Sequence, residues 1–203
     1  DEITLRGKDT FKISSANYAG DHHAYYLYTI TPKQLGKTEK IIKKIEGVGL
    51  KVHMQLLSND EAVDGFSWTP AELVAVRAEM DAMLDAYPRT VISSKYYHKV
   101  ITTGQMLGRP FGWMECPSVT DTIDKRVPQP KRLTNFIRWA SDLETVHRCC
   151  TSETRDCATC KDGAAHMSWV MVNKRAHMQS AEELQNWIEV YEMFAKLYQF
   201  IPW

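Results

Sequence analysis

The sequence predicts an α/β protein in which parallel strands alternate with helices, followed by a small Cys-rich α+β region. Stretches in which apolar and polar residues alternate are followed by stretches with apolar residues at helical spacing, and turn residues separate them. Strand, helix, strand order with short connections is typical of βαβ units and a parallel sheet. The second part is set apart because four of the five cysteines lie between residues 147 and 163.

The first predicted strand is followed by a loop and a helix. FKISSANY, residues 11–18, has the composition of a short strand, and the following AGDHHAYYLYTI has no helical period and is predicted to be a loop. Residues 31–49 then predict an amphipathic helix. Thr31 can cap it, Pro32 suits the first helical position and Gly47 can end it.

The same order then repeats. LKVHMQLLS, residues 50–58, alternates apolar with polar side chains as a strand does. Residues 69–88 predict a helix opened by a capping box between Thr69 and Glu72, and RTVISSKYY, residues 89–97, predicts a third strand. Three strands alone would leave an apolar edge unpaired. The stretch is therefore either the core of a small α/β domain or a piece of a larger sheet.

A change in composition after residue 104 predicts a domain boundary. Gly, Pro and aromatic residues are frequent there, and a basic, Pro-containing connector, DKRVPQPKR, follows. Residues 133–146 predict a helix, residues 166–173 a strand, and residues 180–200 a final amphipathic helix. The two expected domains are residues 1–104 and residues 105–203.

The composition argues against several classes of function. Lys plus Arg and Asp plus Glu each number 25, so no global charge points to nucleic acid or to an anionic membrane. The longest apolar runs fall well short of the ~20 residues that span a bilayer. The charged first residues do not resemble a secretory signal. A cytoplasmic protein with no nucleic-acid or membrane partner is therefore expected. In that compartment clustered cysteines more often hold metal or do redox chemistry than form disulfides.

The cysteines have the spacing of a metal site. Cys157 and Cys160 form a Cys-x-x-Cys pair, which puts two thiolates on one tight turn. Because adjacent cysteines rarely ligate the same ion, one of Cys149 and Cys150 is expected to join the pair, with Cys116 as the fourth ligand. Zinc and a [4Fe-4S] cluster both accept four thiolates, and the spacing does not separate them. Disulfides, a redox pair and chance clustering stay open as alternatives.

The strands KISSANY, KVHMQLL and TVISS, the helices between them and the Cys-rich region form a combination that extends over residues 10–173. This combination resembles the C-terminal half of a radical S-adenosylmethionine enzyme with a twitch or SPASM-like appendage. The resemblance implies a partial (β/α) barrel of parallel strands over residues 1–104, with three βα-type units. A small Cys-rich α+β appendage with a C-terminal helix would follow over residues 105–203. The first three βα units of the barrel would be missing from this chain.

The resemblance also implies a function. In this family a radical derived from S-adenosylmethionine abstracts hydrogen from an organic substrate, and an auxiliary [4Fe-4S] cluster occupies the appendage. The expected cofactors are S-adenosylmethionine and this cluster, and the expected partners are a small-molecule or peptide substrate and the missing N-terminal half-barrel. The family's Cys-x-x-x-Cys-x-x-Cys loop, which holds the radical-generating cluster, has no match in the sequence. The chain is therefore not expected to cleave S-adenosylmethionine by itself.

Candidate site residues follow from this resemblance and from the rule that active sites of parallel βα folds form at the C-terminal ends of the strands. The residues implied to lie near S-adenosylmethionine are Ser15, Asn17, His53 and Gln55. The residues expected near the substrate are His22, His23, Asp60, Lys95 and Tyr96. The candidate metal ligands are Cys116, Cys149, Cys150, Cys157 and Cys160. No residue is assigned a catalytic role.

Two other hypotheses stay open. In the first, the chain is a small α/β binding module in which the same cysteines hold a structural zinc, and the basic connector meets the partner. In the second, Cys157 and Cys160 act directly as a thiol enzyme. This second hypothesis ranks last, because the neighbouring Asp156 and Asp162 oppose a thiolate.

Overall fold

The fold is described from a computed structural model of the 203-residue chain. The residues that the structure describes are 9–21, 23–57, 67–112, 116, 137–139, 146–148 and 159–198.

The described chain opens with helix α2, Thr10–Asn17, in the segment where the sequence predicts the first strand. Asp9 caps this helix, since its Oδ1 accepts the Lys12 N–H at 3.0 Å. Phe11 stacks on Tyr26 with ring centroids 5.1 Å apart. The predicted strand over residues 11–18 is wrong, because the cap and this packing outweigh the local strand composition.

The first strand lies in the stretch predicted to be a loop. β1 is Tyr25–Ile30, and its sequence YYLYTI is rich in the aromatic and β-branched residues that favour strands. It shows no alternation of polar and apolar residues, since its side chains on both faces are mostly half-buried or buried. The residue composition of this segment therefore indicates a strand, whereas its pattern of polar and apolar residues does not.

β1 pairs in parallel with β2, Lys51–Leu56, along the full length of both strands. The second predicted strand is thus confirmed. The crossover between the two contains a short 3-10 helix, η1 (Pro32–Gln34), and helix α3 (Thr38–Glu46). The helix predicted over residues 31–49 is divided, because Gly36 between these helices adopts a φ of 75°.

Helix α5, Pro70–Ala86, confirms the second predicted helix. Its capping box is formed, since Thr69 Oγ1 accepts the Glu72 N–H at 3.2 Å and Glu72 Oε2 accepts the Thr69 N–H at 2.8 Å.

The third predicted strand, residues 89–97, is reduced to a single parallel bridge between Val91 and β2. Ser94 ends the extended segment, because its Oγ accepts the Tyr97 N–H at 3.0 Å and so caps helix α6, Lys95–Thr103. The second half of the predicted strand is therefore helical.

Two short antiparallel pairs of strands follow, and one of them overturns a predicted helix. β3 (Gln105–Met106) pairs with β4 (Arg109–Pro110), and β5 (Ile137–Trp139) pairs with β6 (Val146–Arg148). The helix predicted over residues 133–146 is wrong at β5, whose alternating large apolar residues suit a strand.

Helix α7, Gly163–Val172, replaces the strand predicted over residues 166–173. Asp162 caps it by accepting the Ala165 N–H at 2.7 Å. The helix is buried on most sides, and a short apolar run of this kind cannot be told from a buried strand by its period.

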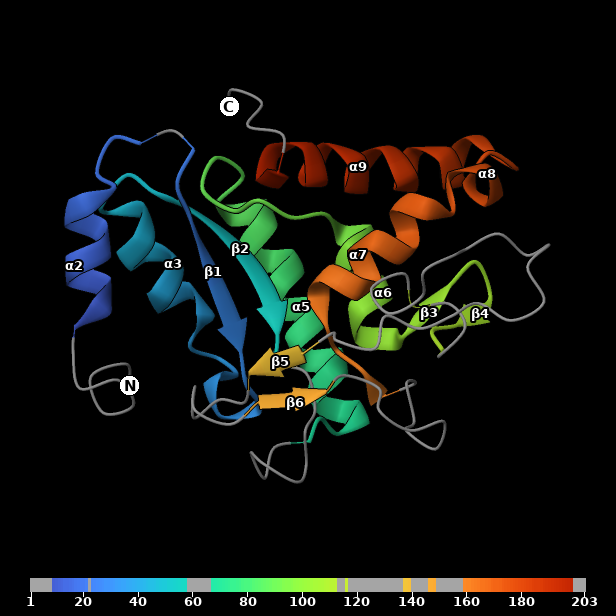
Figure 1. The fold of residues 1–203 in the computed structure, drawn as a ribbon, viewed down its shortest axis with the longest axis horizontal. Helices are drawn as coiled ribbons and strands as arrows, with labels where there is room; N and C mark the ends of the chain where they lie inside the picture. Colours follow the sequence, from blue (N-terminus) through green and yellow to red (C-terminus); the bar gives the residue numbers. More distant parts are fainter. Residues whose placement is uncertain are drawn as a thin grey trace.

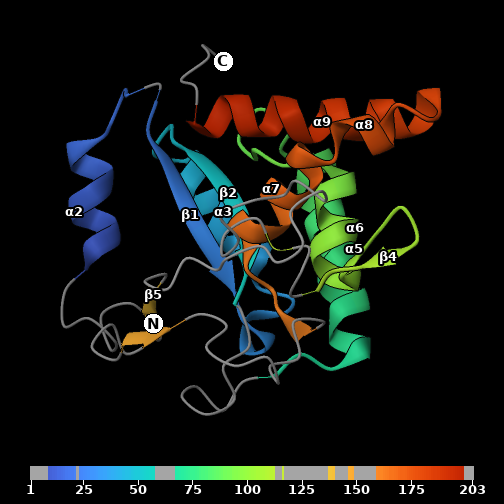
Figure 2. The same ribbon diagram turned by 45° about the vertical axis from the view of Figure 1, so that its right-hand side comes forward.

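Helices α8, Lys174–His177, and α9, Ala181–Tyr198, complete the described chain. α9 confirms the predicted final helix, and Ser180 Oγ accepts the Glu183 N–H at 3.1 Å at its start. α9 packs on α6, α7 and α8, as Figures 1 and 2 show.

The two faces of the β1–β2 sheet meet different helices. Tyr28, which is opposite Met54 in the register, lies near Thr38 of α3 and Glu79 of α5, so these helices cover that face. Gln55 points to the other face, because successive strand residues alternate. The N-terminus of α7 lies against Gln55.

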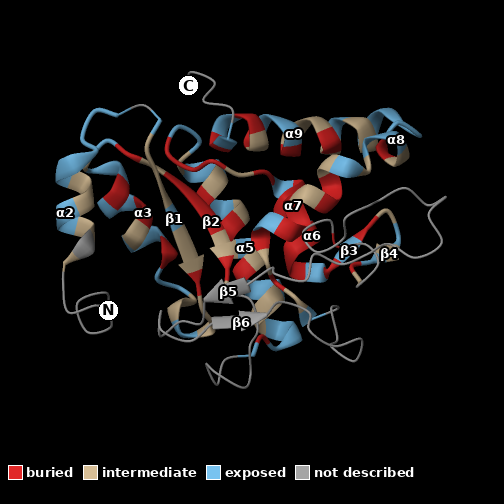
Figure 3. Ribbon diagram, viewed as in Figure 1, coloured by how far each residue is buried: buried red, intermediate tan, exposed pale blue. Residues whose placement is uncertain are grey.

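One cluster of buried apolar side chains extends from Ile30 of β1 to Leu197 of α9. Figure 3 shows buried residues, in red, on β2, α6, α7 and α9. The cluster includes residues on both sides of residue 104. The boundary proposed there stays a prediction, as does the partial barrel, since the described parallel sheet consists of two strands and one bridge. None of the helices described is long and apolar enough to cross a bilayer.

The capping box predicts the effect of a substitution at Thr69. Thr69→Ala removes the side-chain acceptor for the Glu72 N–H, and we expect it to lower the free energy of unfolding by about 1 kcal/mol. Thr69→Ser keeps the hydroxyl and should lose much less. Urea titrations of the three proteins measure the difference, and equal losses for both variants would contradict the capping role.

Candidate functional site

His53 and Gln55 occupy the face of β2 that turns away from α3 and α5. His53 is buried, and its Nδ1 lies 2.9 Å from the Ile92 carbonyl oxygen. Gln55 Nε2 donates to Thr29 Oγ1 of β1 at 2.8 Å. The two strands thus present a polar inner face to the part of the chain that follows α5.

His53 is held in its neutral form. The pKa of His53 is lowered to about 4, chiefly by burial; the hydrogen bond with the Ile92 carbonyl opposes this shift, and nearby His98 adds to it. The carbonyl is an acceptor, so the proton of the neutral ring sits on Nδ1. Nε2 is then left as a hydrogen-bond acceptor.

The first turn of α7 approaches this face so closely that only glycine fits. A Cβ atom at Gly163 would lie 2.6 Å from Tyr97 Oη and 3.3 Å from Gln55 Cβ. Tyr97, in α6, is fully buried, and its ring centroid lies 5.4 Å from that of His53. Its hydroxyl has no hydrogen-bond partner among the described residues. Burial raises the pKa of Tyr97, so the phenol stays protonated.

Cys160 lies directly before this turn. Its Sγ accepts the backbone N–H of Asp162 at 3.5 Å, an interaction that supports negative charge on sulfur. The neighbouring Lys161 is buried, and its Nζ donates to the Thr102 carbonyl at 3.0 Å. Burial lowers the pKa of Lys161, and Cys160 acts in the opposite direction. Sulfur and a buried cation are therefore placed together at the start of α7.

The predicted metal ligands are only partly placed. Cys116 is buried and Cys160 is half-buried, whereas Cys149, Cys150 and Cys157 lie outside the described residues. Within the described residues, no group of three or more His, Cys, Asp or Glu side chains could hold a metal ion. The metal site stays a prediction.

His166 of α7 is a further buried polar residue. Its Nδ1 lies 2.8 Å from the Asp162 carbonyl oxygen, and its ring stacks on Phe111 with centroids 4.2 Å apart. Burial lowers the pKa of His166 to about 4, with Lys161 acting in the same direction and the Asp162 carbonyl against it. Its Nε2 has no hydrogen-bond partner in the described part of the chain.

Ser15 and Asn17 do not join the polar face of β2. Both lie in α2, where Ser15 Oγ donates to the Lys12 carbonyl at 3.2 Å and Asn17 is exposed. α2 is attached to the other side of β1, because Phe11 stacks on Tyr26 and Lys44 of α3 lies over the Phe11 ring. The strand on which their predicted role rested is a helix.

The predicted substrate residues are dispersed. His23 is exposed at the N-terminal end of β1, where its backbone N–H donates to Asp21 Oδ1 at 2.8 Å, so it does not follow a strand. His22 and Asp60 lie outside the described residues. Lys95 is exposed and its Nζ is 2.7 Å from Asp85 Oδ2.

Tyr96 faces a different element. It is buried, and its Oη lies 3.1 Å from Nε2 of His177 in α8. Burial raises the pKa of Tyr96 to about 12. Lys95 and Tyr96 fall within the strand predicted over residues 89–97 but begin α6, which follows the Val91 bridge. Their place near a substrate stays a prediction.

Several residues that shape this site escaped the sequence reasoning. Tyr97 lies in α6, in a segment predicted to be a strand. Gly163 begins α7 and Lys161 precedes it, where the sequence predicts the end of a loop. A signal was present, since "CKDG" places a capping Asp and a Gly immediately before an apolar run.

No protein-family model, curated protein or solved structure matches this chain.

The contact at Gly163 predicts a pair of compensating substitutions. Gly163→Ala should destabilise the protein, because its Cβ would lie 2.6 Å from the Tyr97 hydroxyl. Tyr97→Phe removes a buried hydroxyl without a described partner and should be neutral or stabilising by up to about 1 kcal/mol.

The double variant Gly163→Ala with Tyr97→Phe should recover most of the lost stability. Chemical denaturation of the four proteins gives the coupling between the two positions. Additive losses would show that the hydroxyl does not set the spacing.

The two lowered histidine pKa values predict acid sensitivity. With folded-state pKa values of about 4 for His53 and His166 and ordinary values near 6.5 when unfolded, the unfolded chain binds more protons below pH about 6.5. Stability is therefore full above that pH and falls as the pH drops towards about 4. The expected loss is about 2 kcal/mol per histidine between neutral pH and pH about 5.

Unfolding free energies across this pH range measure the slope. In His53→Gln the dependence of the unfolding free energy on pH should become weaker by the contribution of one histidine. An unchanged slope would mean that the ring of His53 is not held neutral.

Proposed function

We propose that this chain is part of a radical S-adenosylmethionine iron-sulfur enzyme that abstracts hydrogen from an organic substrate. The auxiliary cluster would be held by the Cys-rich region. The observation that carries the proposal is the junction at the start of α7, where Cys160 leads directly into the turn that contacts the polar face of the parallel strands. A cysteine of the proposed cluster is thereby placed close to Gln55, near the C-terminal end of β2, and a parallel βα fold binds its ligands at this end of the strands.

The chemistry of the two described cysteines fits a thiolate-ligated group. The Cys160 sulfur accepts a backbone N–H and has buried Lys161 beside it, and both favour the anionic sulfur that a cluster or a metal requires. Cys116 is buried, as expected for a ligand shielded from water. When bound, such a cluster supplies an electron-transfer or substrate-binding centre. The remaining ligands would come from Cys149 or Cys150 and from Cys157.

The inner face of the sheet offers groups that suit a polar ligand such as S-adenosylmethionine. His53 presents an acceptor nitrogen, because its pKa of about 4 keeps it neutral. The Gln55 amide is oriented by its hydrogen bond to Thr29. Both side chains are fixed by partners in the fold, so they would orient a ligand without first having to be ordered.

The outer strand is suited to an N-terminal half-barrel as partner. Among the described residues β1 pairs with β2 alone, and its other edge is where a further strand would add. Leu27 lies in the middle of β1, opposite His53 in the register, and 55% of it is exposed. An apolar side chain on the inner face next to an available edge favours a larger sheet.

Metal analysis tests the proposal. The chain would be purified and reconstituted anaerobically with iron and sulfide and then compared with Cys160→Ser and, as a matched control within the same helix region, Ser168→Ala. We expect iron and acid-labile sulfide in equal amounts and a broad absorption near ~400 nm in the parent and in Ser168→Ala. Cys160→Ser should lose most of both.

Stoichiometric zinc in place of iron would overturn the iron-sulfur proposal and favour the zinc-containing binding module. Retention of the full iron and sulfide content by Cys160→Ser would remove this cysteine from the ligand set.

A further inference from the structure

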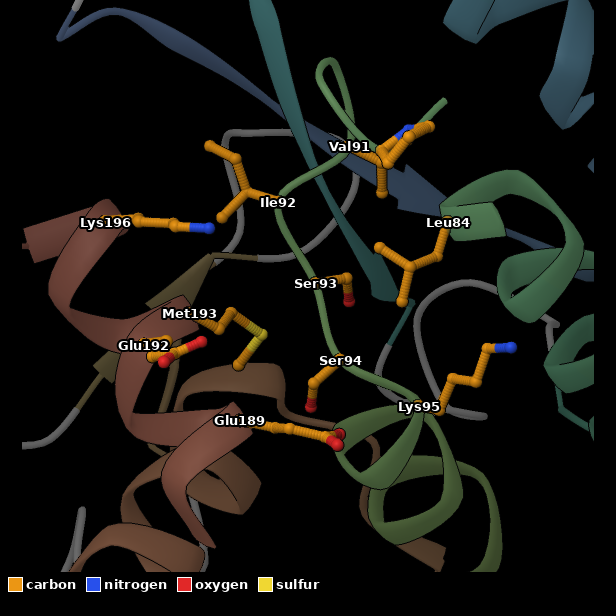
Figure 4. A pocket seen from close by; sticks show the side chains of 11 residues that line it. Leu84, Val91, Ile92, Ser93, Ser94, Lys95, Glu189, Glu192, Met193 and Lys196 are labelled. Atoms are coloured by element: carbon orange, nitrogen blue, oxygen red, sulfur yellow. The ribbon is translucent and has the colours of Figure 1, made fainter. Parts of the chain in front are cut away.

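A cavity of about 290 Å³ lies between the segment that joins α5 to α6 and the facing side of α9. Figure 4 shows Ser93 and Ser94 on that segment, and Glu192, Met193 and Lys196 on α9. One of the residues predicted to lie near a substrate, Lys95, lines this cavity, and the proposed function gives the cavity no role. It lies beside the end of the extended segment, away from the contact between α7 and Gln55.

Ser93 is the first member of a chain of hydrogen bonds that leads from this cavity into the protein. Its Oγ lies 2.5 Å from Nε2 of His98, and Nδ1 of the same ring lies 2.7 Å from Asp81 Oδ1. Ser93 lines the cavity, His98 is fully buried in α6, and Asp81 is part-exposed on α5. This is the arrangement of a serine nucleophile, a histidine base and an orienting carboxylate.

The protonation states fit this arrangement. Burial lowers the pKa of His98, and the hydrogen bond and charge of Asp81 act in the opposite direction, so the ring is neutral and oriented. A carboxylate can only accept, so the ring proton sits on Nδ1 and is donated to Asp81. Nε2 is then an acceptor, and the Ser93 hydroxyl donates to it. The imidazolium formed when His98 takes the serine proton would lie against the Asp81 carboxylate.

The first turn of α6 supplies electrostatic support beside Ser93. Ser94 caps the helix by accepting the Tyr97 N–H at 3.0 Å. The backbone N–H groups of Lys95 and Tyr96 belong to the first helical turn, where no intrahelical acceptor exists. A helix N-terminus of this kind favours negative charge, which develops on the oxygen of an attacked carbonyl.

We propose that Ser93 is a nucleophile that takes the acyl group of small activated esters, with His98 as its general base and Asp81 as the residue that positions the base. Ser93 Oγ attacks the carbonyl carbon as its proton passes to His98 Nε2, and the bond to the leaving oxygen or sulfur breaks. The products are acyl-Ser93 and the leaving-group anion. Water then attacks the acyl carbon, one of its protons passes to the Ser93 oxygen as the bond to the acyl carbon breaks, and a carboxylic acid is released. The proton that His98 took from Ser93 is lost to solvent and balances the charge of the leaving-group anion.

The burial of His98 narrows the class of substrate. The ring lies behind Ser93, so it can take the serine proton but has no exposed surface from which to protonate a departing group. Leaving groups that depart as stable anions, phenolates or thiolates, are therefore the ones that fit. Leu84, Ile92 and Met193 give the cavity an apolar wall, which suits a short apolar acyl chain.

Acetylation by p-nitrophenyl acetate tests the proposal on the full chain. We expect a burst of p-nitrophenolate close to one equivalent of protein, and acetyl-Ser93 identified by peptide mass spectrometry. Ser93→Ala should abolish the burst. Asp81→Asn should slow it by about 100-fold or more, because the histidine is then held in the wrong tautomer.

Asp85→Asn is the matched control. It makes the same change of charge on the same helix one turn further on, at an exposed position 2.7 Å from Lys95. This variant should keep the burst rate. Circular dichroism and melting temperature establish that each variant is folded. If Asp81→Asn does not fold, Ser93→Ala and the mapped site of acetylation decide alone.

Three outcomes would overturn the proposal. The first is acetylation at Lys95 or Ser94 in place of Ser93. The second is a burst that persists in Ser93→Ala. The third is labelling of Ser93 no faster in the parent than in a folded Asp81→Asn variant, which would reduce the three residues to a structural hydrogen-bond chain.

Discussion

Three consecutive buried residues at the start of α6 hold the described structure together. Tyr96 contacts His177 of α8, Tyr97 meets His53 of β2 and the first turn of α7, and His98 binds a carboxylate of α5. Successive helical residues point about 100° apart, so one turn of helix faces three different elements. Because interiors are close-packed, a shift of α6 to suit one of these contacts would disturb the others. Because Ser94 caps this turn, its position sets where α6 begins and therefore also where these three contacts form.

The contacts made by the first turn of α6 explain why the parallel sheet can be small. Among the described residues, β2 makes one further parallel contact, the bridge between Val52 and Val91, and a pair of strands has little stability by itself. The sheet is held by helices on both faces, and α6 places α7 and α9 against the side that α3 and α5 leave open. On that side His53 is buried and Gln55 is half-buried, and both have partners within the fold, as the hydrogen bonds to Ile92 and Thr29 show.

The elements that were predictable from the sequence carry strong local signals. The capping box at Thr69 and the alternation of β2 each act within a few residues, and both are present in the structure. The wrong predictions of secondary structure fall in segments whose conformation is determined by packing against the rest of the protein. YYLYTI has no period because residues on both of its faces are at least partly buried, with Leu27 as the exception, and the run in α7 has none because that helix is buried on most sides. Topology then misplaced His23, since its predicted strand is a helix.

The candidate sites show the same division. Cys157 and Cys160 are recognisable as a pair because two residues separate them, whereas Asp81 and His98 are 17 positions apart in two helices. Only the packing of α5 on α6 brings that carboxylate to that ring. Ser93 is five residues from His98. Side chains at this spacing are far apart in a continuous strand, but they can meet here because Ser94 starts a helix between them. A sequence interpretation that extends the strand through residue 97 therefore excludes this contact from the outset.

The buried histidines differ in what their second nitrogen meets, and this difference assigns their roles. In His53, His166 and His177, Nδ1 lies against a backbone carbonyl, which fixes the tautomer and leaves Nε2 as the acceptor. A carbonyl cannot compensate a full positive charge on the ring as well as a carboxylate does. His98 alone among these four has a carboxylate behind it and a hydroxyl at the wall of a cavity in front of it. Of the four rings, His98 is the one whose positive charge after protonation would be stabilised by a carboxylate. We therefore assign base catalysis to His98 and the positioning of a polar ligand to His53.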